Sequence, residues 1–87
     1  MSPSGDASKK TGMRNRTEHA PVLSLLGERL QQARRARGLT QRDLADALAI
    51  SVAYLSLMER GGRNPPYSTV ARLARELEVP VARLFPG

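Results

Sequence analysis

Apolar residues recur every three or four positions along most of the chain, which is the spacing of amphipathic helices. Leu26, Leu30 and Ala33 predict a first helix from about residue 24 to residue 37. Gly38 follows where a left-handed residue commonly ends a helix. The chain shows no strand-like alternation and no internal repeat. This pattern predicts an all-α domain.

Two short helices follow, with a tight turn between them. Thr40 precedes the first, and Asp43 lies three residues later, so the two can form a capping box. Ser51 is placed to cap the second, which should end near Arg60 before a pair of glycines. Two capped helices around a tight turn are typical of a helix-turn-helix, whose second helix enters the DNA major groove.

The C-terminal part predicts two further helices. One should begin after Ser68, and its buried face should carry Val70, Leu73, Ala74 and Leu77. Pro80 is placed in the first turn of a short fifth helix. With Tyr54, Tyr67 and Phe85 as the only aromatic residues, the core must be aliphatic.

Residues 1–20 lack apolar periodicity and predict a disordered tail, so residues 21–87 form the expected domain. The tail carries four basic residues, Lys9, Lys10, Arg14 and Arg16. It is either a solvated leader or an arm that contacts DNA.

The formal net charge is +6, from 14 basic and 8 acidic residues. This balance favours a polyanionic partner such as nucleic acid, although it also promotes solubility.

Several classes of protein find no support in the sequence. There is no cysteine, which excludes disulfides and thiolate metal sites and fits a reducing cytoplasm. No apolar run is long enough for a membrane helix, and no secretory signal is evident. Ser51 and Ser56 have no histidine partner, and His19 has no second metal ligand nearby. We therefore expect a cytoplasmic, nucleoid-associated protein that is not an enzyme and has no cofactor, metal or small-molecule ligand.

The second short helix has an unusual outer face. Leu55 and Met58 fall together and should face the core. The opposite side is mostly apolar and carries no acidic residue; it consists of Val52, Ala53, Ser56, Leu57 and Arg60. Such a surface indicates a partner.

Four segments in order, RGLTQRDLA, YLSLMERG, RNP and LARELEVPVARLF, resemble the Xre family of helix-turn-helix regulators, which includes phage Cro and C1-type repressors. The resemblance runs from about Leu26 to Phe85. It implies a compact five-helix bundle of the lambda-repressor-like type, with double-stranded DNA as the partner and a recognition helix starting at Ser51.

The resemblance also implies roles for individual residues. Those expected to face base edges are Ser51, Val52, Ala53, Ser56 and Leu57. Those expected to contact phosphates are Thr40, Gln41, Tyr54, Arg60, Arg63 and Asn64. Gln41 is also expected to brace a side chain on the recognition helix.

Two structural roles have plainer alternatives. The resemblance implies a buried ion pair between Arg34 and Glu59, which could instead be two solvated charges. Val81, Leu84 and Phe85 are expected to form a homodimer interface, or they could simply close the core. A two-fold dimer would place its recognition helices about 34 Å apart on a palindromic site.

Two features depart from the family pattern. Ala49 stands in the turn where glycine is usual, and alanine adopts a left-handed backbone only at a cost of about 1 kcal/mol. The recognition face lacks Gln, Asn and Lys, so Val52, Ala53 and Leu57 would meet thymine methyl groups, and DNA shape would contribute to specificity.

The sequence thus predicts a DNA-binding transcriptional regulator, most simply a dimeric repressor. The biological setting stays open among a phage or plasmid repressor, a restriction–modification controller, an antitoxin and a host regulator. The alternative is a protein-interaction module on the same scaffold, which the apolar outer face favours.

Overall fold

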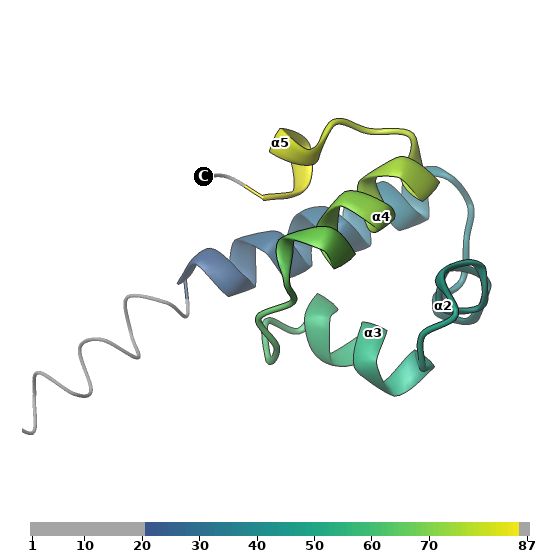
Figure 1. The fold of residues 1–87 in the computed structure, drawn as a ribbon, viewed down its shortest axis with the longest axis horizontal. Coiled ribbons are helices and arrows are strands. Elements are labelled where there is room, and N and C mark those ends of the chain that lie inside the picture. Colours follow the sequence, from purple (N-terminus) through teal and green to yellow (C-terminus); the bar gives the residue numbers. More distant parts are fainter. Residues whose placement is uncertain (1–20, 86–87) are drawn as a thin grey trace, which may run out of the picture.

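The computed structural model describes residues 21–85, and this part contains five helices and no strand (Figure 1). The N-terminal helix covers residues 21–36. The others are α2 (Gln41–Leu48), α3 (Val52–Glu59), α4 (Tyr67–Leu77) and α5 (Val81–Leu84). The prediction of a five-helix, all-α fold is confirmed. The predicted tail, residues 1–20, lies outside the described residues, and the domain boundary stays a prediction.

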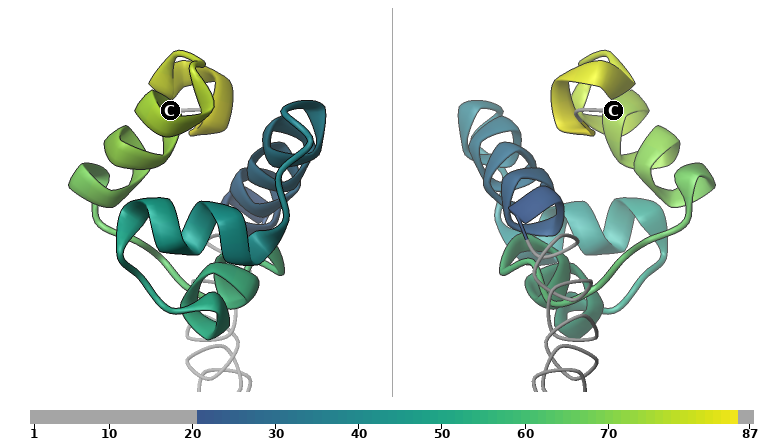
Figure 2. Two further views of the ribbon diagram at one scale, coloured as in Figure 1. Left: turned by 90° about the vertical axis from the view of Figure 1, so that its right-hand side faces the viewer. Right: turned by 90° about the vertical axis from the view of Figure 1, so that its left-hand side faces the viewer.

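The five helices pack around one hydrophobic core. The N-terminal helix and α4 run across the molecule, α2 lies at one end, and α3 and α5 lie at opposite edges (Figure 1). In the views of Figure 2, the N-terminal helix and α4 lie on either side of α2, with α3 at one edge of the molecule and α5 at the other. The helix-turn-helix therefore occupies one face, and the α4–α5 turn occupies the other.

The core is aliphatic, as the scarcity of aromatic residues predicts. Its fully buried hydrophobic side chains come from all five helices; they are Leu26, Leu30, Leu44, Ala45, Leu48, Leu55, Met58, Val70, Leu73, Ala74, Leu77 and Leu84. Burying one leucine side chain contributes about 1.5–3 kcal/mol. This core fixes which face of α3 remains outside.

The predicted capping box begins α2. Thr40 Oγ1 accepts a hydrogen bond from the Asp43 N–H at 3.0 Å, and Asp43 Oδ2 accepts one from the Thr40 N–H at 2.9 Å. The Thr40 backbone N–H, followed by its side chain, lowers the pKa of the Asp43 carboxyl. The capping box thus satisfies the N–H groups of Thr40 and Asp43 at the start of α2 with side chains three positions away.

The turn between α2 and α3 keeps the usual shape although it contains Ala49. This residue adopts the left-handed conformation with φ 58° and ψ 40°. The Ile50 N–H then donates to the Ala45 carbonyl at 3.0 Å and closes the end of α2. The sequence analysis anticipated strain here, and the cost of holding alanine in this conformation is about 1 kcal/mol.

Two helix boundaries differ from the predicted ones. The N-terminal helix already includes residues 21–23. In addition, α4 begins at Tyr67 rather than after Ser68. Pro66 sits at the N-cap with φ −65°, and its carbonyl accepts hydrogen bonds from the N–H groups of Thr69 and Val70. The proline therefore starts the helix without a side-chain cap.

Gly27 lets the backbone of the N-terminal helix lie close to the backbone at the end of α3. Gly27 lies where the N-terminal helix meets the end of α3, and a Cβ atom there would lie 2.5 Å from the Glu59 carbonyl oxygen and 2.7 Å from that of Met58. Both neighbours are backbone atoms, so they cannot rotate away. The position of α3 therefore depends on the missing side chain of Gly27.

We expect Gly27→Ala to lower the free energy of unfolding by about 1–3 kcal/mol, because the added methyl group forces the two backbones apart. Urea denaturation followed by circular dichroism measures this change. Gly62→Ala is the control, since a Cβ there would meet its nearest atoms at an ordinary 3.5 Å. Equal denaturation midpoints for the two variants would contradict the close approach.

Candidate nucleic-acid interface

The residues predicted to read bases share one surface of α3 and its N-cap. Ser51 and Ala53 are exposed, whereas Val52, Ser56 and Leu57 are half-buried. On the other side of the helix, Leu55 and Met58 are fully buried. The division between a core face and an outer face therefore follows the sequence pattern, and base contact by the outer residues stays a prediction.

Ser51 has a structural role at the start of α3. Its Oγ accepts a hydrogen bond from the Tyr54 N–H at 3.0 Å. A hydroxyl group that accepts one hydrogen bond can still donate its own proton. Ser51 can therefore cap the helix and donate outward at the same time.

A buried ion pair anchors the other end of α3. Arg34 Nε lies 2.6 Å from Glu59 Oε2, and Arg34 Nη2 lies 3.0 Å from Glu59 Oε1. Both residues are only 7% exposed. The alternative of two solvated charges is therefore excluded. The two-pronged geometry is the strongest arrangement between an arginine and a carboxylate.

Two further hydrogen bonds extend this pair into a network. Arg34 Nη1 donates to the Leu39 carbonyl at 2.7 Å, and Gln41 Nε2 donates to Glu59 Oε1 at 3.0 Å. Gln41 thus braces Glu59, the side chain at the end of α3, as the resemblance implied. Within residues 21–85, every buried side-chain nitrogen and oxygen has a hydrogen-bond partner. The network joins the N-terminal helix, the following loop, α2 and α3.

An arginine of α4 holds the end of α2. Arg72 Nη2 donates to the Leu48 carbonyl at 2.5 Å, which satisfies one of the free carbonyl groups at a helix C-terminus. The sequence alone assigns no role to Arg72. Its spacing from Leu48 gives no local signal, since the contact forms only when α4 packs on α2.

The loop after α3 presents exposed cationic and polar side chains. Arg60, Arg63 and Asn64 are exposed, and the Arg63 guanidinium carbon lies 5.2 Å from the centre of the Tyr54 ring. That distance is within the range of a cation–π interaction. The half-buried ring of Tyr54 thus orients Arg63 beside α3, a pairing that the sequence analysis did not anticipate.

The predicted dimer interface needs one correction. Leu84 is fully buried inside the single chain, so it belongs to the core and cannot meet a second subunit. The prediction for Leu84 is wrong because α5 turns this side chain inward onto the other helices. Val81 and Phe85 are half-buried, and their part in a dimer stays a prediction.

The region that carries this geometry matches a known family. Residues 25–84 match the family model described as "Helix-turn-helix domain". The chain belongs to this family. The HTH-type transcriptional regulator DdrOP3 of Deinococcus deserti is 45% identical over 62 residues, which cover 71% of this chain and 48% of that protein. The chain spans about half the length of the first curated relatives that it matches.

Solved structures of the family share the fold. The restriction-modification controller protein C.AhdI from Aeromonas hydrophila has a TM-score of 0.69 at 35% identity, over 72% of this chain and 96% of that one. The DNA-binding domain of BldD has a TM-score of 0.70 at 26% identity, over 77% and 97%. These likenesses confirm the resemblance to Xre-type regulators. The family consists of DNA-binding regulators rather than enzymes.

Other kinds of site receive no support from the described domain. Among residues 21–85, no three His, Cys, Asp or Glu side chains are grouped so that they could hold a metal ion. No helix in that range is long and apolar enough to cross a membrane.

We expect Glu59→Ala to lower the free energy of unfolding by about 3–5 kcal/mol, because it leaves the Arg34 charge buried without its partner. The change is measured by urea denaturation. Arg37→Ala is the control, since Arg37 and Glu78 form an exposed pair at 2.9 Å and such pairs contribute about 0–1 kcal/mol. If the two variants lose similar stability, the Arg34–Glu59 pair does not anchor α3.

Proposed function

We propose that this chain binds double-stranded DNA through α3 and regulates transcription. The observation that carries the proposal is the outward face of α3. It is apolar and hydroxyl-bearing, the one acidic residue of the helix is Glu59, which is buried, and exposed arginines follow it at Arg60 and Arg63. A helix of this kind suits the major groove, where phosphates lie on both sides.

The two kinds of contact divide between the outer face and its surroundings. The proposed base-reading residues are Ser51, Val52, Ala53, Ser56 and Leu57. Apolar side chains recognise thymine by its methyl group, and the serines can bond to several base edges. The proposed phosphate contacts are Thr40, Gln41, Tyr54, Arg60, Arg63 and Asn64. Arginines supply the salt-dependent part of the affinity.

We further propose a homodimeric repressor that occupies a palindromic operator in the cytoplasm, on the nucleoid. A core this small gains stability from a second subunit, and Val81 and Phe85 on α5 leave partly exposed apolar surface for it. A dimer with two-fold symmetry would place two copies of α3 in successive major grooves. Bound over a promoter, such a dimer blocks polymerase by occupancy.

Selection from a random DNA pool tests the proposal. We expect an enriched palindromic site with two chains bound per site, measured by analytical ultracentrifugation.

Arg63→Ala should weaken binding to cognate and random DNA by a similar factor and reduce the slope of log affinity against log salt by about one. Arg35→Ala, at an exposed position on the N-terminal helix, is the control and should have a smaller effect.

Failure to enrich any sequence would count against specific DNA binding. A single chain on each enriched site would reject the dimer and leave DNA binding intact. Loss of affinity for cognate DNA alone in Arg63→Ala would assign Arg63 to base reading rather than to a phosphate.

The role of Tyr54 can be tested separately. Tyr54→Phe removes the hydroxyl group that is proposed to contact a phosphate, and Tyr54→Leu also removes the ring that lies against the Arg63 guanidinium. We therefore expect Tyr54→Phe to weaken DNA binding and Tyr54→Leu to weaken it about two- to fivefold further. Fluorescence anisotropy with the selected site measures both. Equal losses in the two variants would show that the ring does not orient Arg63, and full affinity in Tyr54→Phe would reject the phosphate contact of its hydroxyl group.

A further inference from the structure

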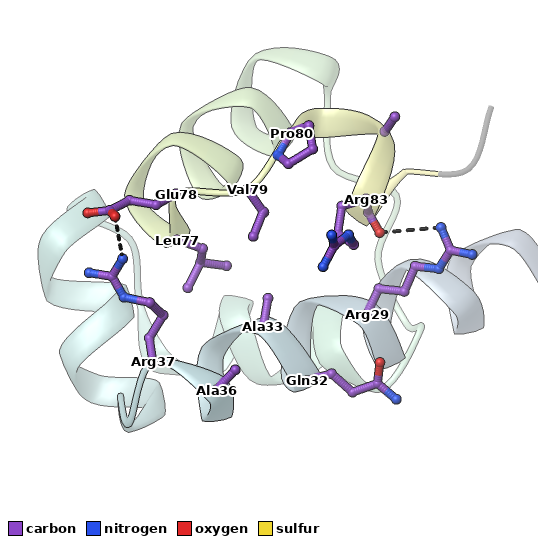
Figure 3. Close-up of a pocket in the computed structure, with 11 residues that line it drawn as sticks. Arg29, Gln32, Ala33, Ala36, Arg37, Leu77, Glu78, Val79, Pro80 and Arg83 are labelled. Carbon is purple, nitrogen blue, oxygen red and sulfur yellow. Dashed lines mark hydrogen bonds and ion pairs between the residues drawn. The ribbon is translucent and has the colours of Figure 1, made fainter.

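A groove lies on the face of the molecule away from α3, between the N-terminal helix and the α4–α5 turn (Figure 3). Its volume is about 870 Å³, which is within the range of binding sites rather than of packing defects. Its floor is apolar and includes Ala33, Leu77 and Val79, with Pro80 above them (Figure 3). The sequence analysis gave no sign of this groove.

Arginines stand around this apolar floor. Arg29 comes from the N-terminal helix, Arg37 directly follows the end of that helix, and Arg83 comes from α5. Glu78 is the single acidic residue that lines the groove. Arg37 lies 2.9 Å from Glu78 at one end, and Arg29 Nη1 donates to the Arg83 carbonyl at 3.3 Å at the other. The Arg83 side chain points from α5 toward the N-terminal helix (Figure 3). Three positive charges therefore face one negative charge.

We propose that this groove binds an acidic amphipathic segment of a partner protein. The apolar side of such a segment would cover Ala33, Leu77 and Val79, and its carboxylates would pair with the arginines at the rim. Arginine forms two parallel hydrogen bonds to a carboxylate more readily than lysine does, and partial exclusion of water strengthens such pairs.

The charge of the groove disfavours occupants from this chain. A two-fold interface brings the same patch of each subunit together, so two copies would set Arg83 and its neighbours against their own like charges. Residues 1–20 carry four basic and two acidic side chains, so their net charge repels them from the same surface. An acidic partner is the occupant that removes this repulsion.

The groove and the proposed DNA-binding surface use different residues. The groove is lined from the N-terminal helix and from residues 77–83, and no lining residue comes from α2 or α3. Figure 1 shows α3 and α5 at opposite edges of the molecule. A partner in the groove can therefore bind while α3 is occupied, and the proposal holds whether or not the chain binds DNA.

The full chain can be tested with fluorescein-labelled synthetic helical peptides. The probe has Leu at positions i, i+3, i+4 and i+7 and Glu at most other positions; one comparison peptide replaces Glu with Lys, and another scrambles the probe sequence. We expect fluorescence anisotropy to detect binding of the probe alone, with an affinity that falls as salt rises. Binding of the lysine peptide, or of the scrambled one with equal affinity, would overturn the proposal. So would no binding of the probe.

Charge reversal then locates the site. Arg83→Glu should weaken binding of the probe about tenfold, since it replaces an attraction with a repulsion. Ala36→Glu, on the wall that the N-terminal helix forms, should also weaken it. Arg35→Glu is the matched control, because Arg35 is likewise exposed near a helix end but does not line the groove. Equal losses in Arg83→Glu and Arg35→Glu would show non-specific charge attraction and overturn the proposal.

Two measurements separate this site from the others. Arg83→Glu should leave the affinity for the selected DNA site within about twofold, because Arg83 lies on the far face from α3. Ala36→Glu, which lies in the groove wall away from the proposed dimer contacts Val81 and Phe85, should leave the sedimentation coefficient unchanged. Dissociation of a dimer by Ala36→Glu would mean that a second copy occupies the groove. A probe that competes with DNA in the wild-type chain would place the acidic peptide on α3. Either result would overturn the proposal and leave the DNA-binding function standing.

Discussion

The carboxylate of Glu59 is the point on which the arrangement of the helix-turn-helix depends. It accepts hydrogen bonds from Arg34 Nε, Arg34 Nη2 and Gln41 Nε2, so the end of α3 is tied to two other helices at once. Arg34 Nη1 also donates a hydrogen bond to the Leu39 carbonyl, in the loop before α2. A buried charge is tolerated only when its partners are complete, and here a small displacement of any one element would leave part of the group unsatisfied. The network therefore fixes geometry as well as stability.

Gly27 supports the same contact from the backbone. Its lack of a side chain lets the N-terminal helix approach the last carbonyl groups of α3, and that approach helps to place Arg34 within reach of Glu59. The ion pair and the glycine act together, since a wider separation of the two helices would lengthen the hydrogen bonds of the pair. The Arg34–Glu59 ion pair and Gly27, which has no side chain, thus both determine where α3 lies against the N-terminal helix.

Local signals account for what the sequence predicted well. The capping box of Thr40 and Asp43 needs only residues that are close in sequence, and so does the Ser51 cap. The buried faces follow from helical spacing. The start of α4 was misplaced because Pro66 begins that helix by its fixed φ and carries no capping side chain. Ser68 is a typical N-cap residue and therefore suggested a helix start that lies two residues too late.

Contacts between distant residues could not be read in the same way. Arg72 reaches the Leu48 carbonyl, and Arg63 lies over Tyr54, yet neither pair has helical spacing. The inward turn of Leu84 likewise depends on how α5 packs. The Arg34–Glu59 pair was anticipated from family resemblance alone. Physical reasoning on the sequence could place each charge near a helix end and could not choose its partner.

Arginines flank two surfaces with different chemistry. Arg60 and Arg63 stand beside a helix whose outer residues are small or apolar, whereas Arg29, Arg37 and Arg83 surround an apolar hollow. A net charge of +6 indicates a polyanion without saying which surface meets it. The shape of each surface supplies the distinction, since a projecting helix can enter a DNA groove and a hollow can receive another segment.

The sparse hydrogen-bonding capacity of α3 makes the rigidity of its supports more important. Apolar contacts with thymine methyl groups have no preferred direction, and their energy falls away within about 1 Å of the best separation. In the proposed complex, discrimination between bases would then depend on how accurately Val52, Ala53 and Leu57 are placed. A long side chain can reach a base edge from several backbone positions by changing its rotamer, whereas the short side chains of Val52 and Ala53 cannot. The buried network at Glu59 therefore does for this helix what directional side chains do for others: it holds the reading surface in one orientation.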